Sequence, residues 1–280
     1  MTSQAPIRTR SWLFTPATRP ERFAKASQAG ADVAILDLED AVAPGDKARA
    51  RTTALDYLTK NPSDGALHAL RINGLDTRAG ISDLDALLGS TAAPDFLVLP
   101  KTETAGHIEI LDRLLTAAGK ATRLIGLIES ARGLAAVEAI ATATPRLAGL
   151  MLGAADMAAD LGATVAWEPL AFVRCRLIAA CALAGVVSVD SPYFDLHDEP
   201  GLKREVNGAV TFGFSAKAAI HPAQIGAINA ALTPSAEAVK RARAILAENT
   251  KGVGTVDGQM IDEAVARKAR RTLFSAGLEV

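Results

Sequence analysis

Two acidic residues follow two apolar runs of the chain and could together bind a metal ion. Glu129 follows the apolar residues 124–128, and Asp156 comes shortly after the apolar residues 147–152. The carboxyl ends of parallel strands meet at one edge of a sheet, so we expect both carboxylates there. Such a pair suits Mg²⁺, which prefers oxygen ligands and adds water or substrate oxygens, whereas zinc would require His or Cys neighbours. The alternative for both acids is an ion pair or a helix N-cap.

Other polar residues are also expected at strand ends. They are Asp37, Glu39, Asp40, Arg71, Lys101, Glu129, Asp156, Asp190 and His221. The guanidinium of Arg71 could bind a substrate carboxylate through two parallel hydrogen bonds. The alternative is an ion pair between Arg71 and the acidic segment 37–40, and the two roles are compatible. The candidates for substrate binding are Thr15, Asp37, Glu39, Arg71, Lys101 and Glu129.

Eight apolar segments that alternate with helical patterns must position these residues. The predicted strands lie within 11–16, 33–40, 66–73, 96–101, 124–133, 147–156, 186–192 and 214–221. Each crossover is long enough for a right-handed βαβ unit, so we predict an α/β fold, a (β/α)8 TIM barrel over 1–232. A doubly wound open sheet is the alternative. Residues 233–280 are predicted to form a C-terminal helical extension, with helices at 235–249 and 261–275 and a glycine-rich hinge at 251–258.

Composition and charge narrow the class of protein. Of the 280 residues 49% are hydrophobic but only 4% aromatic, which suits helices packed around a parallel sheet. The 30 basic and 31 acidic residues give a net charge of −1, so nothing favours binding to nucleic acid or to a membrane surface. The N-terminus lacks an apolar leader, and no run reaches the roughly 18 apolar residues of a membrane span. We therefore predict a cytoplasmic protein.

A series of short motifs extends over about residues 11 to 275. In order they are Leu13-Phe14-Thr15-Pro16, Arg19-Pro20-Glu21-Arg22, Leu36-Asp37-Leu38-Glu39-Asp40, Arg71-Ile72-Asn73, Leu99-Pro100-Lys101, Ile128-Glu129-Ser130-Ala131-Arg132-Gly133, Ala159-Asp160-Leu161-Gly162, Ala219-Ile220-His221-Pro222 and Gly258-Gln259-Met260-Ile261-Asp262. Taken together, they resemble the citrate lyase beta-subunit-like branch of the HpcH/HpaI aldolase superfamily.

The resemblance implies a Mg²⁺-dependent carbon–carbon lyase. Its substrate would be a 3-hydroxy-3-carboxyacyl thioester, such as malyl-, citramalyl- or citryl-CoA, and its products an acetyl-type thioester and a 2-oxo acid. By this resemblance Glu129 and Asp156 bind Mg²⁺, and Arg71 holds the 2-oxo-acid portion. Asp262 would enter the active site of a neighbouring subunit of a homotrimer and act as the acid/base. The alternative for Asp262 is a solvated acid near a helix start.

Two positions depart from the pattern of the family. Ala155 stands where an acidic residue often precedes the second metal ligand, and Glu263-Ala264 follows Asp262 where the family often has proline. The first departure is expected to alter the outer shell of the metal. Relatives that act on free pyruvate and aldehydes use a loop histidine as base. No early loop of this chain offers one, and His221 is expected to be structural or part of the wall of the site.

Three other functions remain open from the sequence. One is the catalytic beta subunit of a citrate lyase complex, which would act on an acyl-carrier-protein thioester. Another is hydrolysis of malyl-CoA by a thioesterase. The third is a barrel without chemistry that binds a ligand or serves as a scaffold, and the presence of Arg71, Glu129, Asp156 and Asp262 argues against it.

Overall fold

Eight parallel strands close into a barrel in the computed structural model, which describes residues 8–60, 65–249 and 254–278. Each strand pairs with the next along the chain, and β1 also pairs with β8. This topology confirms the predicted TIM barrel and excludes the open sheet. The strands are β1 (Ser11–Pro16), β2 (Val33–Asp37), β3 (Leu67–Arg71), β4 (Phe96–Leu99), β5 (Arg123–Ile128), β6 (Leu147–Leu152), β7 (Val187–Asp190) and β8 (Ala216–Ala219).

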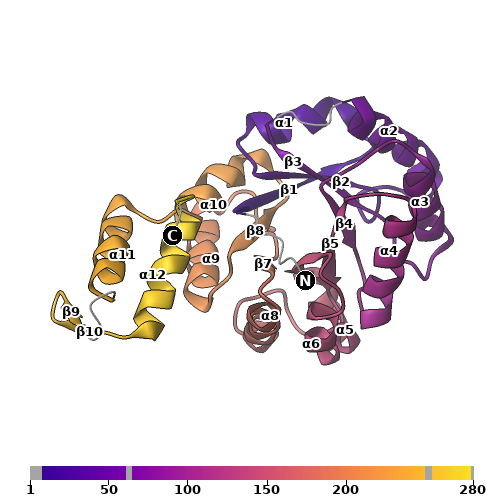
Figure 1. The fold of residues 1–280 in the computed structure, drawn as a ribbon. Coiled ribbons are helices and arrows are strands. Elements are labelled where there is room, and N and C mark those ends of the chain that lie inside the picture. The colour runs from indigo at the N-terminus through magenta and orange to yellow at the C-terminus, as the bar shows by residue number, and fades with distance from the viewer. Residues whose placement is uncertain (1–7, 61–64, 250–253, 279–280) are drawn as a thin grey trace. The chain divides into compact units, whose positions relative to one another are not determined.

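Helices connect the strands and surround the barrel (Figure 1). They are η1 (Pro20–Arg22), α1 (Phe23–Gln28), η2 (Pro44–Asp46), α2 (Lys47–Lys60), α3 (Arg78–Gly89), α4 (Ala105–Ala117), α5 (Ala131–Ala135), α6 (Val137–Ala141), α7 (Ala154–Leu161), α8 (Ala171–Ala184), α9 (Glu199–Phe212), η3 (Pro222–Gln224) and α10 (Ile225–Leu232). Several helices begin soon after a strand at a residue whose side chain accepts a backbone N–H, namely Thr77, Thr104, Ser130 and Asp198. Such caps satisfy amide groups that a helix start leaves unpaired.

The alternation of side chains along each strand decides which residues face the mouth of the barrel. On β5, Ile125 and Leu127 belong to the inner apolar cluster, whereas Leu124 and Ile128 belong to the cluster beneath the helices. Because successive side chains of a strand point to opposite faces, Glu129 follows Leu127 on the inner side. Arg71 follows the inward Ala69 on β3 in the same way.

The last part of the chain forms a second compact unit. Contacts divide the chain into residues 1–228 and 229–280, whereas the sequence predicted a boundary after residue 232. In the second unit α11 (Ala236–Asn249) and α12 (Glu263–Ser275) pack through an apolar cluster of Ala242, Ile245, Ile261, Ala269 and Leu273.

The predicted glycine-rich hinge is partly wrong. Its residues 251–253 lie outside the described part of the chain, but β9 (Gly254–Val256) pairs antiparallel with β10 (Gln259–Ile261). Asp257 and Gly258 both have positive φ, as the tight turn of a two-residue hairpin requires. The glycines therefore serve a hairpin at this position. Within the described residues, no helix is both long and apolar enough to cross a membrane.

Candidate functional site

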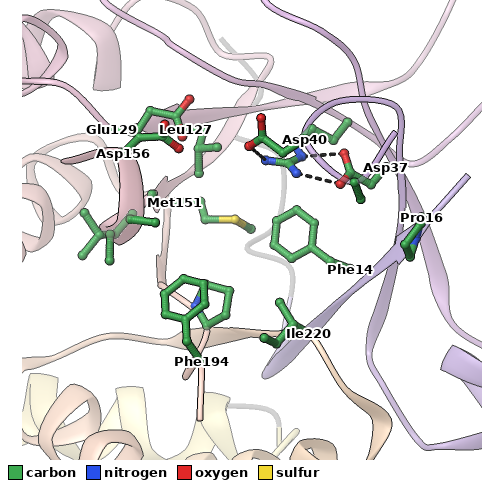
Figure 2. Close-up of a pocket in the computed structure, with 17 residues that line it drawn as sticks. Phe14, Pro16, Asp37, Asp40, Leu127, Glu129, Met151, Asp156, Phe194 and Ile220 are labelled. Atoms are coloured by element: carbon green, nitrogen blue, oxygen red, sulfur yellow. Dashed lines mark hydrogen bonds and ion pairs between the residues drawn. The ribbon is translucent and has the colours of Figure 1, made fainter. Parts of the chain in front are cut away.

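A cavity of about 390 Å³ lies at the mouth of the barrel. Its lining divides into a charged side, contributed by β2, β3, β5 and α7, and an apolar side, contributed largely by β1 and by the loops after β7 and β8 (Figure 2). The charged lining residues are Asp37, Asp40, Arg71, Glu129 and Asp156. Four of the predicted strand-end acids, Asp37, Asp40, Glu129 and Asp156, thus meet Arg71 in one cavity.

Glu129 is a buried carboxylate that forms no ion pair among the described residues. Glu129 is only 3% exposed, and its Oε1 accepts the backbone N–H of Lys101 at 2.7 Å. Burial, together with the charges of Glu39 and Asp156, raises the pKa of Glu129 to about 8. A Cβ atom at Gly153 would overlap Glu129 Oε2, so the carboxylate occupies space that only glycine leaves free.

Asp156 completes a pair that fits Mg²⁺. It lies in the first turn of α7, and Figure 2 shows its carboxylate on the same side of the cavity as that of Glu129. Both donors are oxygens, and a cation between them would offset the repulsion that raises the pKa of Glu129. No group of three or more His, Cys, Asp or Glu side chains that could hold a metal occurs among the described residues. A metal bound here would therefore complete its shell with water or substrate oxygens.

Arg71 forms the ion pair that the sequence left open as its alternative role. Its Nε and Nη2 donate to the two oxygens of Asp37 at 2.7 and 2.6 Å (dashed in Figure 2). Its Nη1 lies 2.7 Å from Glu39 Oε2 and 3.7 Å from Asp40. A guanidinium has five N–H donors, so Arg71 can hold Asp37 and still donate to a ligand in the cavity that it lines. The guanidinium group of Arg71 also packs over the ring of Phe14, whose centroid is 4.7 Å from Arg71 Cζ.

Glu39 and Lys101 contact the charged residues of the cavity without lining it, Glu39 through Arg71 and Lys101 through Glu129. Burial raises the pKa of Glu39 to about 7 against the opposing effect of Arg71, and the charges of Asp40 and Asp37 add to the rise. Lys101 Nζ lies 3.6 Å from Glu39 Oε1. The backbone of Lys101 has φ of 49°, a region that residues with a side chain seldom adopt, and this conformation accompanies the N–H donated to Glu129.

Three other residues expected at the site have different surroundings. Thr15 is buried between Phe14 and Pro16, and it is these two neighbours, on the opposite face of β1, that line the cavity. Asp190 points away from the barrel interior and binds Lys217 Nζ at 2.7 Å, because the inward position belongs to Val189. His221 caps η3, since its Nδ1 accepts the N–H of Ala223 at 3.2 Å.

The apolar side of the cavity was not predicted from the sequence. Phe14, Leu127, Met151, Phe194 and Ile220 line it, and Figure 2 shows Phe194 and Ile220 across Met151 and Phe14 from the acids. Leu127 could have been found, because it precedes Glu129 by two residues on the same strand. Phe194 lies in an irregular loop after β7, where no periodicity indicates its direction.

Asp262 lies in the second compact unit. Its carboxylate caps α12 by accepting the N–H of Val265 at 2.9 Å, and its side chain is exposed. This contact corresponds to the helix-start role that the sequence left as the alternative. It does not exclude proton transfer, because a carboxylate has two oxygens and a cap occupies one of them.

The sequence of the chain matches a family of known enzymes. The profile of the HpcH/HpaI aldolase/citrate lyase family matches residues 10–222. The L-malyl-CoA/beta-methylmalyl-CoA lyase of Cereibacter sphaeroides is 35% identical over 292 residues, which cover 93% of this chain and 92% of that protein.

Two solved structures extend the comparison. RipC from Yersinia pestis is 59% identical, with a TM-score of 0.74 over 82% of this chain and 97% of that chain. CitE from Mycobacterium tuberculosis, in complex with magnesium, acetoacetate and coenzyme A, is 36% identical, with a TM-score of 0.80 over 96% of this chain and 98% of that chain. Another CitE structure holds magnesium and pyruvate. These matches confirm the resemblance found in the motifs.

Proposed function

Because the chain belongs to the HpcH/HpaI aldolase/citrate lyase family, we propose that it cleaves a 3-hydroxy-3-carboxyacyl-CoA in a Mg²⁺-dependent reaction. The substrates are thioesters of the malyl, citramalyl or citryl type, and the products are an acetyl-type thioester and a 2-oxo acid. The relatives support this assignment, since one is a malyl-CoA lyase and another binds magnesium with coenzyme A.

The observation that carries the proposal is the electrostatic division within one cavity. Glu129 and Asp156 present two carboxylates to the cavity, while Arg71, on β3, presents a fixed positive charge to the same space. A 2-oxo acid needs both features, because its carboxylate and carbonyl oxygens can contact a metal ion and a guanidinium at once.

In the reaction the C–C bond between the thioester α-carbon and the hydroxyl-bearing carbon breaks. The hydroxyl group loses its proton and becomes the carbonyl of the 2-oxo acid, while the bonding electrons form a thioester enolate that gains a proton on carbon. Mg²⁺ held by Glu129 and Asp156 would supply Lewis-acid stabilisation of the oxygens of the 2-oxo acid. Arg71 orients the carboxylate of this portion, and its rigid ion pair with Asp37 keeps the guanidinium in place.

Asp262 is the proposed acid that protonates the α-carbon of the enolate. In the condensation direction the same group, as a carboxylate, removes that proton from the acetyl thioester. The proposal includes a homotrimer in which Asp262 reaches the cavity of a neighbouring subunit. It rests on the resemblance of the final motif and on the exposure of the Asp262 side chain.

Turnover of the three thioesters tests the proposal. Purified protein with Mg²⁺ should release glyoxylate from malyl-CoA, pyruvate from citramalyl-CoA or oxaloacetate from citryl-CoA, and removal of the metal with EDTA should stop the release. Product analysis separates the alternatives, because a thioesterase would release free coenzyme A without a 2-oxo acid. Turnover only of the acyl-carrier-protein thioester would identify a citrate lyase subunit. Folded protein without any of these activities would contradict the proposal.

A further inference from the structure

Behind the apolar side of the cavity lies a second cavity of about 370 Å³. Ala155, Pro192 and Phe194 line both cavities, so these residues form the partition between them. We call Pro192, Phe194 and Ile220 the apolar wall. Phe194 is 46% exposed, and its side chain is not embedded in the core. The space available to a ligand on this side therefore depends on where the loop after β7 is held.

Lys217 holds the start of that loop from outside the barrel. The residue is fully buried, and its Nζ donates to the carbonyl oxygen of Ser191 at 2.7 Å. The same ammonium group contacts Asp190 Oδ2 at 2.7 Å and Glu205 Oε1 at 2.8 Å. Arg174 binds the other oxygen of Asp190 at 3.0 Å. Buried ion networks contribute little stability compared with apolar packing, which favours a role in fixing geometry.

Gln224 ties the middle of the loop to the end of β8. Its Nε2 donates to the carbonyl oxygen of Tyr193 at 2.7 Å, and its Oε1 accepts the backbone N–H groups of Ile220 and His221 at 3.0 and 3.3 Å. The side chain is buried, so these three contacts are well protected from water. One amide thus sets the distance between the two loops that carry Phe194 and Ile220.

The chemistry of the substrate indicates what meets this wall. The hydroxyl-bearing carbon carries four groups: a carboxylate, a hydroxyl, the thioester arm and a variable substituent. The carboxylate and hydroxyl require the charged side, formed by Arg71, Glu129 and Asp156. The thioester arm must leave through the open mouth of the cavity, because coenzyme A is far larger than about 390 Å³ can enclose together with the acid. The remaining substituent is directed toward the apolar side.

We propose that the apolar wall, positioned by Lys217 and Gln224, selects the 2-oxo acid by the size of its apolar substituent. The inference rests on the proposed function and deepens it. The preferred acids have a short hydrocarbon substituent, and a shorter side chain at position 194 leaves the space in which a longer substituent fits. Lys217 and Gln224 are positioning residues, since they act on the ligand only through the loop.

Substrate preference in the condensation direction tests the inference. Acetyl-CoA and Mg²⁺ are supplied with glyoxylate, pyruvate, 2-oxobutyrate or 2-oxovalerate, and kcat/KM is measured for each acid. Phe194→Ala should raise the ratio of kcat/KM for 2-oxovalerate over pyruvate by roughly tenfold or more, the value of one or two methylene groups in an apolar pocket. Gln224→Met removes the N–H donor to Tyr193 and the oxygen that accepts from Ile220 and His221, so it should change the ratio in the same direction but less.

Phe172→Ala is the matched control, because this phenyl group on α8 is 70% exposed and lines neither cavity. It should keep the wild-type ratio. If Gln224→Met does not fold, Phe194→Ala still decides, since its side chain is half exposed. Active Phe194→Ala protein with an unchanged ratio would overturn the inference, as would a change confined to the KM of acetyl-CoA.

Calorimetry separates failure of this inference from failure of the proposed function. Pyruvate and 2-oxovalerate are titrated into the Mg²⁺-loaded wild type and into Phe194→Ala. Without turnover by the wild type the proposed lyase activity fails, yet a gain in relative affinity for 2-oxovalerate in the variant would still support the wall. Equal relative affinities in the two proteins would overturn it.

Discussion

Asp37 and Glu129 are two buried carboxylates at the mouth of one barrel, and their electrostatic surroundings differ. Asp37 is 1% exposed and receives two N–H groups of Arg71 together with the backbone N–H of Glu39. Glu129 is 3% exposed and receives the backbone N–H of Lys101, while burial, together with the charges of Glu39 and Asp156, raises its pKa. The first carboxylate forms an ion pair with a guanidinium, whereas the second forms none among the described residues.

This difference assigns separate tasks to residues of similar type. A buried carboxylate that is neutralised by arginine can orient that arginine but has little left to offer a metal ion. A buried carboxyl group beside a second acid keeps its proton at neutral pH, and a divalent cation can replace that proton. The contrast therefore separates a positioning pair, Asp37 and Arg71, from a metal-binding pair, Glu129 and Asp156.

The largest effect is expected from Glu129→Gln. The change removes a negative metal ligand, and turnover should disappear. Loss of a residue that only contacts a metal ligand lowers metal affinity by up to about 100-fold, so loss of the ligand itself should lower the affinity for Mg²⁺ by more than about 100-fold. Isothermal titration with Mg²⁺ and the lyase assay measure both. Glu109→Gln, an exposed position on α4, is the matched control and should behave as the wild type. Undiminished Mg²⁺ binding by Glu129→Gln would remove the basis for the contrast.

Asp262→Asn asks whether a third carboxylate, outside both pairs, carries the proton. Asparagine caps helices about as well as aspartate, so the cap of α12 should persist, while kcat should fall by about 10²- to 10⁴-fold. Thermal unfolding and kcat are measured on the same preparation. Asp262→Ala should lose about 1 kcal/mol of helix stability in addition. Wild-type kcat in Asp262→Asn would leave Asp262 with the capping role alone.

Asp37→Asn should lower the stability of the fold, whereas Glu129→Gln should lower the affinity for Mg²⁺. Removing one partner of a buried ion pair should lower the free energy of unfolding by about 3 kcal/mol, the lower end of the usual range, because Glu39 still faces Arg71. Affinity for Mg²⁺ should stay close to that of the wild type. Urea unfolding and Mg²⁺ titration together check this result. A loss of Mg²⁺ binding as large as in Glu129→Gln would mean that the two pairs act as one site.

The pH dependence of stability probes Glu129 alone, in the absence of metal. Glu129 has a folded-state pKa of about 8 against an ordinary value of 4.5, so its contribution to stability is full below about 4.5 and is lost as the pH rises to about 8. In the absence of metal, Glu129→Gln should therefore match the wild type near pH 4.5 and exceed its stability increasingly up to pH 8, by at most about 1.4 kcal/mol per pH unit.

Denaturant unfolding at several pH values measures that difference, and added Mg²⁺ should reduce it by stabilising the wild type alone. A constant gap between the two proteins across this pH range would show that Glu129 has no raised pKa.

The sequence was sufficient for the barrel and for the residues on its charged side. Strand-end position and two-residue alternation together place Glu129 and Arg71 at the mouth. Strand-end position alone misplaces Asp190, which is turned outward to Lys217. The pairing of Arg71 with Asp37 depends on the register of β2 and β3, which no spacing in the sequence reveals.

Loops and short strands limited the remaining predictions. Phe194 is held by contacts of its neighbours with Lys217 and Gln224, residues more than twenty positions away in the chain, so local patterns do not indicate its direction. The hairpin of β9 and β10 has strands of three residues, too short for an alternation to stand out beside the glycines. The direction of Phe194 depends on tertiary contacts that composition does not encode.

Anomalous diffraction from crystals loaded with Mn²⁺ in place of Mg²⁺ and soaked with pyruvate tests the central claim most directly. The account predicts one anomalous peak in the cavity, within coordination distance of both Glu129 and Asp156, with the carboxylate of pyruvate between the metal and Arg71. A peak bound instead to Asp37 or Glu39, or no peak in the cavity of a crystal that binds pyruvate, would contradict it.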